Sequence, residues 1–103
     1  MQFTRWSQLS LIEQMANIGS EVDRAIQWRH NKNTEYAQLA NIRALELFDL
    51  TLADCRHGSG VKEIARAREL WLDFFIGKNQ YHQTDRLWRQ YFLAFATASR
   101  LDR

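Results

Sequence analysis

Val61–Ile76, with the sequence VKEIARARELWLDFFI, is the stretch that decides the fold. Wound as a helix at about 100° per residue, it gathers its aliphatic residues, its tryptophan and both phenylalanines on one broad arc. Four of its charged residues form a ribbon on the opposite side: Lys62, Arg66, Glu69 and Asp73. An apolar arc this wide needs two or more covering helices, so the stretch predicts a helical bundle.

The rest of the chain divides into three further helical windows, because it contains no proline and few glycines. Ser10 and Glu13 form a capping-box pattern at the start of the first window. Gly58 and Gly77 have the position of helix C-caps. The sequence therefore predicts one all-α domain over residues 1–103, an antiparallel up-down-up-down four-helix bundle. The expected helices cover residues 10–30, 34–55, 60–76 and 85–101.

Gly19 lies inside the apolar stripe of the first window. A glycine within a helix costs roughly 1 kcal/mol relative to alanine. Close approach of a neighbouring helix would explain it, and a tolerated defect is the plainer alternative.

Composition limits the class of protein. Hydrophobic residues make up 46% and charged residues 25% of the chain, which indicates a soluble globular protein rather than a disordered one. The single cysteine, Cys55, excludes an intramolecular disulfide and favours a reducing cytoplasm. No apolar run is long enough to span a bilayer, and the first residues lack the apolar core of a secretory signal.

Metal and cofactor sites are not expected. A di-iron bundle needs Glu-x-x-His pairs on two helices, and the sequence contains none. One cysteine cannot build a structural zinc site, and all three histidines, His30, His57 and His82, fall in predicted turns. We therefore predict no metal and no cofactor.

The signals for catalysis are weak. Cys55 falls on an apolar arc and reads as a small buried residue, although Arg56 and His57 would activate the thiol if they turned towards it. Small all-α HEPN ribonucleases carry an arginine, a short gap and a histidine, and Arg24 to His30 has a compatible spacing. Asn31 follows where those enzymes commonly have tyrosine, so we infer no membership in that family. Ribonuclease activity is the third of the functions considered.

Arg68 interrupts the apolar arc of the decisive stretch. A buried guanidinium must be paired, and the acids at neighbouring helix edges that would reach it are Glu21, Glu46 and Asp49. The alternative is a residue at a seam between helices, with its stem over Trp71 and its charge in water.

Two outward surfaces carry the functional hypotheses. The second window has apolar residues outside its core arc, and these predict a contact surface: Tyr36, Leu39, Ile42 and Leu50, together with Trp28 of the first window. Scattered surface leucines are also ordinary in monomeric proteins. We therefore predict a small cytoplasmic non-enzymatic interaction module whose partner is a second copy of itself or another protein, and which does not bind membranes.

The runner-up function is RNA or DNA binding. The net charge is only +2, but residues 52–103 hold nine of the fourteen basic groups. The outer arc of the last window carries arginines with no acid between them, which suits phosphates: Arg86, Arg89 and Arg100, with Arg103 beyond. The alternative is a solvated face balanced by acids on a neighbouring helix.

Overall fold

The computed structural model describes residues 3–54, 58 and 60–101, and within these residues all regular structure is helical. A short helix comes first and four long helices follow: α1 (Phe3–Trp6), α2 (Leu11–His30), α3 (Thr34–Leu52), α4 (Gly60–Phe75) and α5 (Asp85–Leu101). The four predicted helices are thus present, within three residues of the expected ends. Cys55, Arg56, His57, Ser59 and Arg103 lie outside the described residues.

Local side-chain chemistry explains where the long helices begin. Ser10 is the N-cap of α2, and its side chain and that of Glu13 exchange hydrogen bonds with each other's backbone amides, completing the capping box. Asn33 caps α3 by accepting a hydrogen bond from the amide of Tyr36 at 3.1 Å. A capping side chain therefore accepts a hydrogen bond from one first-turn amide of each helix.

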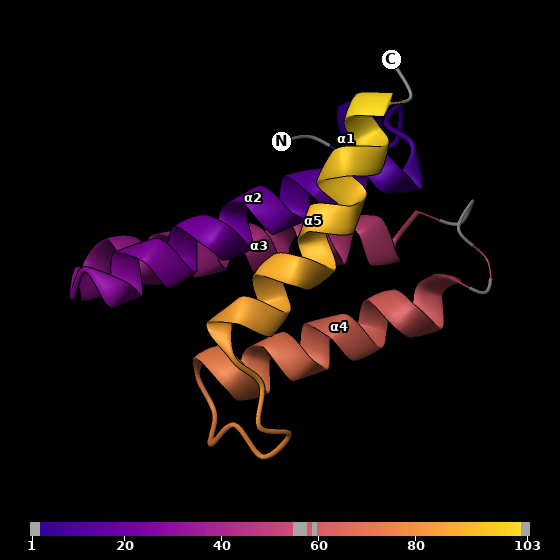
Figure 1. Cartoon of the computed structure of the whole chain (residues 1–103). Helices are drawn as coiled ribbons and strands as arrows, with labels where there is room; N and C mark the ends of the chain where they lie inside the picture. Colours follow the sequence, from indigo (N-terminus) through magenta and orange to yellow (C-terminus); the bar gives the residue numbers. More distant parts are fainter. Residues whose placement is uncertain (1–2, 55–57, 59, 102–103) are drawn as a thin grey trace.

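The four long helices alternate in direction, so the predicted up-down bundle is confirmed (Figure 1). α2 and α3 run side by side as a hairpin, α4 packs against α3, and α5 crosses α2. Aromatic side chains join α4 to α5. None of the described helices is long and apolar enough to cross a lipid bilayer.

Trp71 of α4 lies at the centre of the core with none of its surface exposed. Its ring stacks on Phe75 at 4.8 Å and meets the edge of Trp88 from α5 at 5.5 Å. Its indole nitrogen donates to Asn41 Oδ1 of α3 at 2.7 Å. One side chain therefore connects three helices, and the buried Asn41 serves as its acceptor.

The short helix α1 was not predicted. Trp6, its last residue, is fully buried and donates from its indole nitrogen to Thr51 Oγ1 of α3 at 3.0 Å. Gln14 Nε2 donates to the carbonyl oxygen of Trp6 at 3.0 Å and to Asp54 Oδ2 at 3.1 Å. The N-terminal segment therefore plugs one end of the bundle through a buried hydrogen-bonded cluster.

Gly19 lies where α5 crosses α2. A Cβ atom added at this position would lie 2.6 Å from the Cβ of Phe92, a distance that real contacts essentially never show. Close approach of a neighbouring helix is thus the reason for this glycine. Because the obstructing atom adjoins the backbone of α5, any larger residue would require α5 itself to move.

Candidate interaction surfaces

The outer surface of α3 carries three apolar side chains, each three residues from the next. Tyr36, Leu39 and Ile42 are 48%, 43% and 51% exposed. Their spacing of three residues places them along one side of α3, away from the face that packs on α2. Trp28 of α2 is 37% exposed and meets Tyr36 edge to face at 4.9 Å. We call these four residues the exposed strip.

Leu50 was predicted to belong to the same surface, and the structure places it differently. It is partly buried and packs against the buried core cluster. Its contacts therefore lie mainly within its own bundle, and it is not included in the exposed strip.

Three charged residues of α3 flank the exposed strip: Glu35, Arg43 and Glu46. All three are exposed, and in the part of the chain that the structure describes none of them forms an ion pair. Unpaired charges beside an apolar strip are free to meet charges brought by a partner.

Arg68 pairs with Asp49, one of its three candidate acids. Its Nε donates to Asp49 Oδ1 at 2.9 Å, and the two side chains are 30% and 60% exposed. The pair joins α4 to the C-terminal half of α3 at a solvent-accessible seam rather than in the core. Glu21 instead pairs with Arg24 on its own helix. An ion pair this exposed contributes at most about 1 kcal/mol, so it aligns two helices more than it stabilises them.

The basic surface of α5 is partly neutralised. Arg89 Nε donates to Asp23 Oδ1 of α2 at 2.9 Å, which is the balancing by a neighbouring helix that the sequence left open. Arg86 and Arg100 are exposed and have no acidic partner among the described residues. Two arginines on this surface therefore remain available to an anion.

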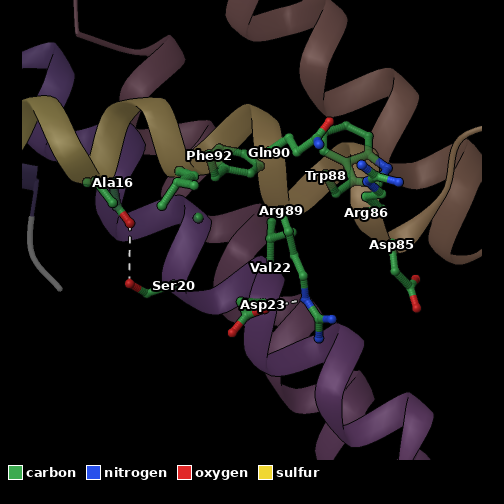
Figure 2. A pocket seen from close by; sticks show the side chains of 13 residues that line it. Ala16, Ser20, Val22, Asp23, Asp85, Arg86, Trp88, Arg89, Gln90 and Phe92 are labelled. Carbon is green, nitrogen blue, oxygen red and sulfur yellow. Dashed lines mark hydrogen bonds and ion pairs between the residues drawn. The ribbon is translucent and has the colours of Figure 1, made fainter.

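A cleft of about 650 Å³ lies between α2 and α5 (Figure 2). Its apolar floor includes Gly19, Val22 and Phe92, and its rim carries acids as well as bases. Figure 2 shows Arg89 extended towards Asp23, which places their ion pair at the rim. A rim of mixed sign does not select strongly for either charge.

A smaller cleft of about 210 Å³ lies between α4 and α5. Tyr91 and Glu63 line it, and the hydroxyl of Tyr91 donates to Glu63 Oε1 at 3.2 Å. Burial, and then the negative charge of Glu63 together with this hydrogen bond, raise the pKa of Tyr91 well above its ordinary range. Trp88, which also lines this cleft, is 3% exposed, and its indole nitrogen has no hydrogen-bond acceptor among the described residues.

The predicted catalytic alternatives gain no support from these contacts. Arg24 and His30 both lie on α2, no hydrogen bond or ion pair joins them among the described residues, and neither lines either of the two clefts. The prediction for Cys55 falls outside the described residues. Within residues 3–54, 58 and 60–101, no three His, Cys, Asp or Glu side chains gather where a metal ion would bind.

Sequence reasoning missed the buried cluster around Gln14 and Asp54. Gln14 is fully buried and Asp54 is 2% exposed. Both residues are polar, so the hydrophobic pattern did not assign them to the core. The only signal in the sequence was the tryptophan at position 6, ahead of the first predicted helix.

No protein-family model, curated protein or solved structure matches this chain, so its function has to be inferred from its own surfaces.

Proposed function

We propose that this protein is a non-enzymatic helical-bundle interaction module that self-associates through the exposed strip. The observation that carries the proposal is the exposure of Tyr36, Leu39 and Ile42 along one side of α3. The single cysteine of the chain suits the reducing cytoplasm in which we expect the protein to act.

The energetic reason is the hydrophobic effect. Each of these side chains leaves roughly half of its surface in water, although the opposite face of α3 is well packed. Covering apolar surface releases about 25 cal/mol per Å², and contiguous exposed apolar residues mark interaction sites more often than isolated ones do. Trp28 extends the strip from α3 onto α2, so the surface spans two helices. A partner with an apolar face of its own would remove all four side chains from water.

Light scattering coupled to size exclusion, over a range of protein concentrations, tests the proposal. The wild-type chain of 12.3 kDa is expected to approach twice this mass as the concentration rises. Leu39→Glu places a charge in the strip and is expected to give the monomer mass throughout. Leu93→Glu is the matched control, because Leu93 is a 57% exposed leucine on α5, outside the strip. A wild-type protein that stays monomeric at the highest soluble concentration would refute self-association.

Phosphate binding by α5 is the second candidate function. It is supported by the exposure of Arg86 and Arg100 without acidic partners among the described residues, and weakened by the engagement of Arg89 with Asp23. Binding of a mixed-sequence oligonucleotide, followed by fluorescence anisotropy, should weaken steeply with salt and fall in Arg86→Glu and Arg100→Glu. Lys62→Glu on α4 makes the same change of net charge away from this surface. Undetectable binding at low salt excludes the candidate.

A further inference from the structure

We propose, resting on the self-association above, that α3 packs antiparallel against α3 of a second copy about a twofold axis beside Leu39. The proposal follows from the order of side chains on the outer surface of α3 and from the helices that flank this surface. It names the partner as this same chain and fixes the register of the contact.

The apolar residues are arranged symmetrically about Leu39. Tyr36 lies three positions before it and Ile42 three positions after it, and all three are about half exposed. In an antiparallel pair about this axis, a residue before Leu39 comes level with the residue an equal number of positions after Leu39 on the partner. Tyr36 is then level with Ile42 of the partner subunit, and Leu39 meets Leu39 of the partner subunit. The strip is therefore complementary to itself.

The charges follow the same symmetry with opposite signs. Glu35 lies four positions before Leu39, and Arg43 lies four positions after it. Each is exposed and has no ion-pair partner among the described residues of its own chain. Antiparallel packing brings Glu35 level with Arg43 of the partner subunit, and the twofold axis produces this pair twice.

A parallel pair would not use these charges. Parallel packing of identical helices in register sets every residue beside its own copy, so that Glu35, Arg43 and Glu46 would each face a like charge. Like charges placed side by side oppose association. The unpaired charges therefore select the antiparallel direction, while the apolar residues alone would permit either.

The flanking helices leave the outer surface of α3 open. α2 lies on the Tyr36 side, where Trp28 contacts Tyr36, and α4 lies on the Asp49 side, where Arg68 forms its ion pair. A second α3 can therefore approach between these two edges without displacing either contact. On the α2 side, Arg43 of the partner subunit comes level with the ring of Tyr36, a position suited to a cation–π contact.

Charge reversal at Glu35 and Arg43 tests the register. Arg43→Glu sets Glu35 against a glutamate twice in each dimer, and Glu35→Arg sets two arginines against each other. Each single variant is therefore expected to dissociate at about tenfold higher concentration than the wild type. In an equimolar mixture of the two variants every such pair is again of opposite sign. Native mass spectrometry should then show the mixed dimer in excess of either parent dimer.

Three comparisons keep the result interpretable. The double variant Glu35→Arg with Arg43→Glu restores both pairs and should dimerise like the wild type. Lys62→Glu makes the same charge change as Arg43→Glu on the outer side of α4 and should leave the dimer unchanged. Circular dichroism of each variant should show wild-type helicity, so that a loss of mass reflects a loss of association.

The two proposals fail differently. A monomeric wild type overturns both. A wild-type dimer that Leu39→Glu dissociates, but that neither single charge reversal weakens, overturns only the antiparallel register, because a parallel pair already sets each charge against its own copy. A wild-type dimer that Leu39→Glu leaves intact shows an interface elsewhere, and also overturns both.

Discussion

Apolar side chains are closely packed where α2 and α5 cross, but they are exposed to water on the outer surface of α3. At the crossing, Gly19 lets Phe92 approach so closely that a Cβ atom would have no space. On α3, Tyr36, Leu39 and Ile42 leave about half of their surfaces in water. The crossing is therefore closely packed, whereas the apolar residues of the exposed strip remain in contact with water.

This difference separates two kinds of residue by the quantity that their substitution should change. A residue of the sealed region contributes to the free energy of unfolding of the single chain. A residue of the open surface has little to lose on unfolding and contributes to association.

The largest effect is expected from the buried Trp6, compared here with Trp28 of the exposed strip. Trp6→Ala removes a fully buried side chain and its hydrogen bond to Thr51, and should lower the free energy of unfolding by about 3–5 kcal/mol. Trp28→Ala removes a 37% exposed tryptophan and one edge contact with Tyr36, and should cost about 1 kcal/mol. Denaturant unfolding at low protein concentration measures both. Equal losses for the two variants would mean that α1 does not plug the bundle.

Gly19→Ala should give the next largest effect. Whether it raises or lowers the free energy of unfolding tests the close approach of α5 to α2. Alanine has the higher helix propensity by about 1 kcal/mol, so an open site would be stabilised. The Cβ at 2.6 Å from Phe92 should instead force α5 away and cost about 1–3 kcal/mol. Ser20→Ala, at the next and exposed position of α2, is the control and should be close to neutral. A stabilised Gly19→Ala protein would contradict the close approach.

The starts of α2 and α3 were predictable because nearby side chains cap them. Ser10 with Glu13, and Asn33, satisfy the first amides of α2 and α3 using atoms within a few residues. α1 was not predictable in this way, because four residues are too few to show a helical period. Trp6 is buried only because Thr51, far along the chain, supplies its hydrogen-bond acceptor.

The candidate surfaces were partly predictable, because the position of a residue around its own helix follows from the sequence alone. A helical projection places Tyr36, Leu39 and Ile42 outside the core arc without knowledge of the partner helices. It cannot show that Leu50 packs against the core, or that Asp49 rather than Glu46 meets Arg68. Both outcomes depend on which neighbour lies at that height along α3, and this is set by the packing of whole helices.

Self-association through the exposed strip should make the midpoint of thermal unfolding depend on protein concentration. If the folded chain dimerises and the unfolded chain does not, each tenfold increase in concentration adds up to about 1.4 kcal/mol to the apparent stability of the dimer. The midpoint of thermal unfolding of the wild type should therefore rise with concentration. The midpoint of Leu39→Glu should not, whereas Leu93→Glu should behave like the wild type. A wild-type midpoint that does not change with concentration would contradict self-association through the exposed strip.

The smallest effect is expected at Tyr91, which is half-buried and so lies between the sealed and open extremes. Burial and the nearby charge of Glu63 raise its pKa in the folded chain above the ordinary value of 10.0. As the pH rises through this ordinary value, the unfolded chain loses the phenolic proton while the folded chain keeps it. Deprotonation then favours the unfolded state, so stability present below this pH should be lost above it.

Tyr91→Phe isolates this contribution, because phenylalanine keeps the ring and has no proton to lose. The wild type and the variant should differ in free energy of unfolding by a constant amount below pH 10.0, the ordinary pKa of tyrosine. Above that pH the wild type should lose stability relative to the variant. Denaturant unfolding of both proteins across this range measures the difference. A difference that stays constant through alkaline pH would mean that Tyr91 is as free to ionise as a residue of the open surface, and that the aromatic side chains joining α4 to α5 do not shield it from water.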